Sequence, residues 1–322
     1  MSEAYDFASM RRAFRHAQFT THLSFAVAAA FLLAAALGGL SLGVRWGPAL
    51  SVFALFAALR WVRLRHERPG GDPRLASGAA VVSVLFAGGI CGGIVCLVGQ
   101  TFAFPFIDPI LSRADLAAGV RVDGMVEAAT RWPWLTALLN VAYQSSFPLV
   151  FITVLGFSWF RRSDRALELC GAFNLCLLIT TICSALFPAV GAFHYLGISP
   201  DVRAELPTGA GTYHLDALFA LREAEAFIID PLDMHGVATF PSFHTALALM
   251  TAAAWRDVPR VRVAMFAWQA VVVVSTIPIG GHYVIDLVVG ACCWAAVHAS
   301  WRLALRRSSN AVEQAAGAAA YA

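Results

Sequence analysis

Two short polar strings in the last third of the chain combine residue types that can do acid–base and nucleophilic chemistry. The strings PSFH at residues 241–244 and GGHYVID at residues 280–286 each stand at the start of an apolar segment. Ionisable side chains are expensive to place in hydrocarbon and usually have a function there. His244, His282 and Asp286 are therefore the first candidates for a functional site.

The spacing of His282 and Asp286 predicts a direct contact between them. Residues four apart lie on one face of a helix, so the carboxylate of Asp286 can accept a hydrogen bond from the imidazole of His282 and fix its tautomer. An imidazole oriented in this way is a candidate nucleophile or base.

The residues beside the two histidines predict that each histidine lies in the first turn of a helix. Pro241 is a residue type that opens helices, and the Gly-Gly pair at residues 280–281 can end one helix and allow another to begin. Free backbone N–H groups and the positive end of the helix dipole meet in a first turn. Both strings are therefore expected to favour a bound phosphate.

The composition is that of a polytopic membrane protein. Of the 322 residues, 59% are hydrophobic and 13% are charged, and the mean hydropathy is +0.69. The net charge of +3 is too small to indicate a nucleic-acid partner. All 23 basic residues are arginine, which is typical of a GC-rich bacterial genome. The seven cysteines fall in apolar runs without a CxxC pair, which favours packing over a disulfide framework or a zinc site.

The apolar runs predict an all-α membrane domain with about eight transmembrane helices. Spans are expected as runs of roughly 17–25 apolar residues. The first run is long enough to span and lacks a convincing cleavage site, so no cleavable signal is expected. The eight spans are placed near residues 22–42, 46–60, 76–100, 132–160, 166–188, 241–255, 263–279 and 282–301.

The arginines predict the orientation of these spans. With a cytoplasmic N-terminus, 17 arginines fall on inner segments and six on outer segments. This asymmetry follows the positive-inside rule in every segment between the predicted spans. Both termini are then cytoplasmic, and His244 and His282 emerge on the outer face of a cell membrane, which for a bacterial chain is the inner membrane.

The expected organisation is a single membrane domain with two long outer loops, near residues 101–131 and 189–240. The second loop is polar, and its length suggests a functional lid or a disordered segment. The periodicity of Leu215–Ile229 predicts an amphipathic helix lying on the membrane over the site. Phe102, Phe104 and Phe106 suit either an entrance at the interface or ordinary anchoring. The parts are a helical scaffold (1–188), an extracytoplasmic loop or lid (189–240), catalytic helices (241–301) and a flexible tail (302–322).

The two strings resemble the Pro-Ser-x-His and His-x-x-x-Asp motifs of the type 2 phosphatidic acid phosphatase superfamily. The resemblance covers roughly residues 185–300. It is strongest toward the branch that contains inositol phosphorylceramide synthases, in which a His-Tyr-x-x-Asp string is usual. Each motif alone is weak, but their order, spacing and shared outer face make the pair specific.

The resemblance implies a metal-independent enzyme with no cofactor. His282 would attack phosphorus and form a phosphohistidine, with Asp286 holding its tautomer. His244 would protonate the leaving oxygen and then activate water or an alcohol. Ser242 would hold non-bridging oxygens. The implied partners are the bilayer, a phosphorylated lipid and, for a transferase, a lipid alcohol.

The chain departs from the family pattern in its basic residues. Ser275 and Thr276 stand where many members have Ser-Arg, and Arg68-Pro69 has Trp61 at the position of the expected lysine. Arg222 is the first candidate to replace the missing arginine, because it is the basic residue nearest in sequence to the site on the outer face. The other candidates for substrate contact are His194, Tyr195, Tyr283 and His214, although solvated loop positions are the favoured interpretation for His214 and His235.

Several alternatives stay open from the sequence. Hydrolase and transferase differ only in whether water or a lipid alcohol reaches the phosphohistidine, and the motifs do not separate them. A lipid phosphatase is slightly favoured because residues 198–235 are polar. A transporter or receptor that binds a proton, metal or ligand at His244, His282 and Asp286 is an alternative of another class. Neither inverted repeats nor helices interrupted at mid-bilayer are evident, and three metal ligands make a poor site.

Overall fold

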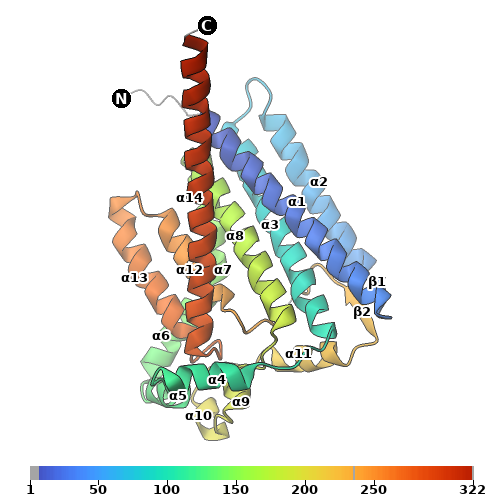
Figure 1. The fold of residues 1–322 in the computed structure, drawn as a ribbon, viewed down its shortest axis with the longest axis vertical. Helices are drawn as coiled ribbons and strands as arrows, with labels where there is room; N and C mark the ends of the chain where they lie inside the picture. The colour runs from blue at the N-terminus through green and yellow to red at the C-terminus, as the bar shows by residue number, and fades with distance from the viewer. Residues whose placement is uncertain (1–6, 235, 321–322) are drawn as a thin grey trace.

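Long helices packed side by side make up most of the chain. The computed structural model describes residues 7–234 and 236–320, so His235 lies outside the described residues. In Figure 1 the short helices gather at the lower end of the bundle, and α14 extends beyond the upper end. The long helices are α1 (Phe7–Leu37), α2 (Trp46–His66), α3 (Pro73–Thr101), α6 (Pro133–Gln144), α7 (Ser146–Trp159), α8 (Ser163–Leu186), α12 (Phe243–Ala254), α13 (Pro259–Ser275) and α14 (Val284–Ala320).

The described helices include five that are long and apolar enough to cross a membrane, or six if α6 and α7 together form one bent span. The predicted count of eight is therefore not confirmed. Helix α12 is apolar but has only 12 residues. At 1.5 Å per residue it reaches about 18 Å, well short of a hydrocarbon core of about 30 Å. Helix α13 has 17 residues.

The predicted span at 132–160 is a broken helix. Helices α6 and α7 meet at Ser145 with a bend of 47°. Pro148 follows the break and has no backbone N–H to donate to the carbonyl of Gln144, four residues earlier, so a continuous helix would lose a hydrogen bond there. The bend leaves α6 beside α13 and α7 beside α8 and α3.

A polar contact in the bundle ties the scaffold helices together. Asn174 of α8 donates through Nδ2 to the hydroxyl of Thr21 in α1 (3.2 Å) and to the carbonyl of Val84 in α3 (3.3 Å). Gly88 of α3 makes room for this side chain, because a Cβ at that position would collide with the Asn174 amide. Helices α1, α3 and α8 therefore form one closely packed group, and α2 packs on the α3 side of it.

The two predicted outer loops are folded. Loop 101–131 contains α4 (Asp108–Ala117) and α5 (Val122–Thr130). Loop 189–240 contains α9 (Ala192–Tyr195), α10 (Pro200–Ala204) and α11 (Leu215–Arg222). Figure 1 shows all five of these helices at the end of the bundle where α14 begins. The chain thus builds a cap of short helices over that end.

The predicted helix over residues 215–229 is only half correct. Helix α11 ends at Arg222, and Ala226–Ile229 forms strand β2, which pairs in parallel with strand β1 (Ser41–Val44). Consecutive apolar β-branched residues favour a strand there. Arg45 donates to the carboxylate of Asp230 (2.6 Å) just beyond the pair. The strand pair therefore fastens the second loop to the segment between α1 and α2.

The C-terminal segment, for which a flexible tail was expected at residues 302–322, is helical where the structure describes it. Helix α14 continues to Ala320, the last described residue. The segment is rich in Ala and also contains Arg, and both residue types have high helix propensities.

Candidate active site

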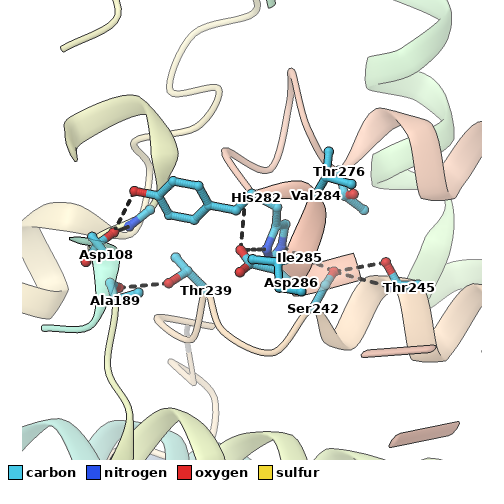
Figure 2. Close-up of polar contacts among 12 residues, drawn as sticks. Asp108, Ala189, Thr239, Ser242, Thr245, Thr276, His282, Val284, Ile285 and Asp286 are labelled. Carbon is cyan, nitrogen blue, oxygen red and sulfur yellow. Dashed lines mark hydrogen bonds and ion pairs between the residues drawn. The ribbon is translucent and has the colours of Figure 1, made fainter. Parts of the chain in front are cut away.

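His282 and Asp286 are held at the start of α14. The Nδ1 atom of His282 lies 3.1 Å from Oδ2 of Asp286, and the backbone N–H of Tyr283 donates to the same oxygen at 3.0 Å (Figure 2). His282 is 3% exposed and Asp286 is fully buried. In the tautomer whose Nδ1–H donates to this carboxylate, Nε2 carries the lone pair. Nε2 is then the nitrogen that can act as a nucleophile.

The second string lies directly against the first. The Nε2 atom of His282 is 3.5 Å from the hydroxyl oxygen of Ser242, and the backbone N–H of Ser242 donates to the carbonyl of Asp286 at 3.1 Å. Ser242 is also the N-cap of α12, where its hydroxyl oxygen accepts from the N–H of Thr245 at 3.4 Å. The first turns of α12 and α14 are therefore joined through one buried serine.

A glycine allows this close approach. A Cβ at Gly290 would collide with the carbonyl oxygen of Ser242. Gly290 follows Asp286 by one helical turn, so it sets how near α14 can come to the first turn of α12. The absence of a side chain at Gly290 therefore sets the distance between Ser242 and His282.

We expect Gly290→Ala to lower kcat by about 100-fold, because an error of about 1 Å in the position of reacting groups costs that much. Turnover by purified, membrane-inserted protein measures the effect. Gly156→Ala is the matched control, because Gly156 also lies in a helix and a Cβ there meets no atom within 4 Å. Equal activity in the two variants would contradict this role of Gly290.

His244 lies in the first turn of α12, two residues after Ser242. Its ring stacks on Tyr143 of α6 with centroids 4.3 Å apart and an interplanar angle of 21°, and Phe147 of α7 meets it edge-on at 5.5 Å. The hydroxyl of Tyr143 is hydrogen-bonded to that of Tyr213 at 3.0 Å. The bend between α6 and α7 thus supplies two aromatic rings that fix the His244 imidazole.

The second loop folds back onto the string at 280–286. The N–H of Ala192 donates to the carbonyl of Gly281 (2.8 Å), and the N–H of Gly211 donates to the carbonyl of Ile279 (2.7 Å). Gly211 and Gly281 both have positive φ, and a Cβ at Gly281 would lie 2.7 Å from the backbone of Gly211. Only glycine fits both the conformation and the approach. The loop therefore packs closely over the segment that carries His282 and Asp286.

His214 is buried, which corrects the expectation of a solvated loop residue. It is 2% exposed, and its Nε2 lies 2.9 Å from the carbonyl oxygen of Val190. Burial lowers its pKa to about 4, so the imidazole is neutral at pH 7 and Nε2–H is the donor. Its Nδ1 is buried and has no hydrogen-bond partner among the described residues. The sequence did not predict the burial of His214, because the second loop is polar and its composition does not show how it folds.

Three of the other residues expected to contact substrate, Arg222, His194 and Tyr195, lie in the folded loop at residues 189–240. Arg222 donates to the carbonyl of Phe104 (2.8 Å), and its guanidinium stands over the ring of Phe106 at 4.0 Å. His194 packs near Phe219 with ring centroids 5.6 Å apart, and Tyr195 is 44% exposed. These contacts place Arg222 and His194 around one aromatic cluster at the edge of the cap. They do not place either residue against the His282–Asp286 pair.

Tyr283 lies inside the protein rather than at a surface open to substrate. Its side chain is fully buried, and its hydroxyl donates to Oδ1 of Asp108 in α4 at 3.1 Å. Tyr283 thus donates both of its hydrogen bonds to protein carboxylates, from its hydroxyl to Asp108 and from its backbone N–H to Asp286. The structure gives Tyr283 a positioning contact where the sequence suggested a substrate contact.

The first turn of α14 is not available for a phosphate, which corrects a second expectation. The N–H groups of Val284 and Ile285 donate to the two carboxylate oxygens of Asp115, both at 2.8 Å. His282 itself precedes the helix, which begins at Val284. The positive end of the α14 dipole therefore faces the carboxylate of Asp115. The other helix start, that of α12 at Ser242, lies beside Nε2 of His282 and is the one left for a phosphate.

The described part of the chain contains no group of three or more His, Cys, Asp and Glu side chains arranged to hold a metal ion. The chemistry available from the described residues is that of two imidazoles, one orienting carboxylate and one hydroxyl. This set can support nucleophilic attack by nitrogen and proton transfer to a leaving oxygen.

Comparison with known proteins agrees with this chemistry. The family model described as the PAP2 superfamily matches residues 109–300, which is more than half of the 322 residues and includes both strings. Searches of curated proteins and of solved structures found no significant match. Members of the matched superfamily are phosphatases or phosphotransferases that act on lipids. On the extent of this match and the geometry of His282, Asp286 and Ser242, the chain belongs to the PAP2 superfamily.

Proposed function

We propose that the protein transfers a phosphoryl-type group from a phosphorylated lipid through a phosphohistidine on His282. Nε2 of His282 attacks phosphorus, the bond from phosphorus to the leaving oxygen breaks, and His244 gives that oxygen a proton. Water or an alcohol then gives its proton to His244 and attacks phosphorus. The phosphorus–nitrogen bond breaks, and His282 returns to its starting state.

The observation that carries this proposal is the contact between His282 and its two neighbours. Nδ1 is held by Asp286 at 3.1 Å, while Nε2 faces the hydroxyl of Ser242 at 3.5 Å. A carboxylate at Nδ1 fixes the tautomer whose Nε2 can attack, and it stabilises the positive charge that develops on the ring. The hydroxyl at Nε2 marks where an oxygen of the phosphate would lie.

The arrangement of arginines supports a site on the extracytoplasmic side of a cell membrane. Figure 1 shows the connections between α2 and α3, α7 and α8, and α12 and α13 at the end of the bundle opposite the start of α14. These connections and the adjoining helix ends are rich in arginine. Arginine-rich segments stay in the cytoplasm, so the cap and the catalytic strings would face outward.

The burial of the site favours the transferase alternative, in which a lipid alcohol takes the place of water. Ser242 and Asp286 are fully buried, and the second loop is hydrogen-bonded to the catalytic segment at Ile279 and Gly281. A covered site protects a phosphohistidine from hydrolysis. This agrees with the resemblance to the inositol phosphorylceramide synthase branch, and we retain headgroup transfer beside hydrolysis.

Product analysis separates the two reactions. Purified protein in liposomes is offered phosphatidic acid, polyprenyl diphosphate or phosphatidylinositol, with and without ceramide or diacylglycerol, and with a chelator present throughout. Release of free phosphate without an acceptor identifies a phosphatase. A new phospholipid that forms only with the lipid alcohol identifies a transferase. The absence of any product from every substrate would contradict the proposed function.

A further inference from the structure

Helix α4 carries two buried carboxylates that both bind the catalytic segment from outside it. Asp115 is 4% exposed, and Asp108, seven residues earlier on the same helix, is fully buried. Both lie in the predicted outer loop at residues 101–131, and nothing in the sequence around them indicates a role. Their contacts with residues 283–285 span about 170 positions of the chain.

Asp115 caps α14 from another helix. One carboxylate oxygen accepts from the N–H of Val284 and the other from the N–H of Ile285, each at 2.8 Å. The N-terminal N–H groups of a helix have no partner within the helix, and an acidic group beside them is favoured by the helix dipole. Asp115 therefore fixes the position of the first turn from which Asp286 projects.

Asp108 binds the same segment at Tyr283, one residue before Val284, and it also binds the second loop. Its carboxylate accepts from the hydroxyl of Tyr283 (3.1 Å) and from the N–H groups of Val190 (2.9 Å) and Gly191 (3.0 Å). Tyr283 is the residue directly after His282. Through Asp108, α4 therefore links the segment that carries the nucleophile with the loop that covers it (Figure 2).

We propose that Asp115 and Asp108 are positioning residues, through which α4 holds residues 282–286 in the orientation that aims Nε2 of His282 at the phosphate. This inference rests on the proposed function for its catalytic part. Its structural part, the anchoring of the first turn of α14 by Asp115, stands on the hydrogen bonds alone. Two measurements can therefore test the two parts separately.

The isosteric substitution Asp115→Asn is the sharpest change. An asparagine side chain has one acceptor oxygen, so it can accept from only one of the two N–H groups, and its NH₂ group would face the other. We expect hydrogen exchange at the amides of Val284 and Ile285 to accelerate at least tenfold, roughly the effect of losing one such bond. We expect kcat to fall about 10- to 100-fold while KM changes less than about threefold.

Two further variants make this test specific. Asp123→Asn removes a carboxylate from the neighbouring helix α5, where it is paired with the exposed Arg121, and should leave both measurements unchanged. Asp115→Glu keeps the charge and both acceptor oxygens, so it should retain more kcat than Asp115→Asn. If the asparagine variant does not accumulate in membranes, a lowered kcat at unchanged KM in the glutamate variant serves in its place.

Each result has a defined meaning. Unchanged exchange at Val284 and Ile285 in Asp115→Asn would overturn the anchoring. Faster exchange with an unchanged kcat would overturn the positioning role, and so would an equal loss of kcat in Asp123→Asn. A wild-type protein that turns over no phosphorylated lipid would contradict the proposed function instead, while the exchange measurement would still decide whether Asp115 anchors the segment.

Discussion

Replacing His282 with alanine is expected to lower turnover by about 10,000-fold or more, because removal of a covalent nucleophile leaves only binding and charge stabilisation. The amount of membrane-inserted protein should stay close to that of the wild type. The imidazole is buried, but its side-chain bond to Asp286 is a local contact between residues four positions apart. Turnover of the substrate found by product analysis, normalised to the purified protein, measures this loss.

His298→Ala is the matched control for this substitution. His298 lies on the same helix, α14, and stacks on Trp294 with ring centroids 5.3 Å apart. It lies 16 residues after His282 in sequence, so its loss should change activity less than about twofold, as expected for a substitution away from the reacting groups. A His282→Ala protein with normal turnover would refute the assignment of the nucleophile.

The second large effect is expected for His244→Ala, and it should depend on the leaving group. A positioned general acid contributes about 100- to 10,000-fold when the leaving oxygen needs a proton. A lipid alcohol is a poor leaving group, so turnover of a phosphorylated lipid by the His244→Ala variant should fall by this full factor. An aryl phosphate with a low-pKa phenol needs no proton, so the variant should form the phosphohistidine from it at nearly the wild-type rate.

The contrast between the two histidine variants separates their roles. The activated aryl phosphate should rescue the first step in His244→Ala and leave His282→Ala inactive, because attack on phosphorus still requires the nucleophile. An equal loss on both substrates in His244→Ala would contradict its role as the general acid. Rescue of His282→Ala by the aryl phosphate would show that the two roles are exchanged.

The pairing of the two histidine strings follows from local sequence rules, and this explains why the sequence could predict it. His282 lies two residues before α14 and Asp286 lies in its first turn, so a separation of only four residues brings the two side chains into contact. Both strings precede apolar helices that enter the bundle at one end, which brings Ser242 to His282. Periodicity and helix-start signals are short-range features, and they can be read without knowing the fold.

The role of α4 could not be predicted in this way. Asp108 and Asp115 look like ordinary acids in an outer loop, and their partners at Tyr283, Val284 and Ile285 are far away in sequence. The same is true of His214, which is buried only because the second loop turns back over Gly281. Long-range contacts of this kind depend on tertiary packing, for which local composition carries no signal.

Arg222 has contacts that its position in the sequence did not indicate. Nearness in sequence and a place on the outer face made it the leading candidate for phosphate binding. In the structure its guanidinium bonds to the Phe104 carbonyl and covers the ring of Phe106. An arginine on an aromatic face gains both stacking and cation–π attraction, so a short loop rich in phenylalanine can hold it away from the catalytic pair.

The most direct test of the account is to trap the phosphorylated enzyme. His244→Ala is mixed with the activated aryl phosphate and quenched in base, where a phosphohistidine survives and a carboxyl phosphate does not. We expect phosphorylation of the peptide that contains residue 282, with slow loss of the label because the group that activates water is missing. The double variant that also carries His282→Ala should show no label. A base-stable label that persists in the double variant would contradict His282 as the nucleophile.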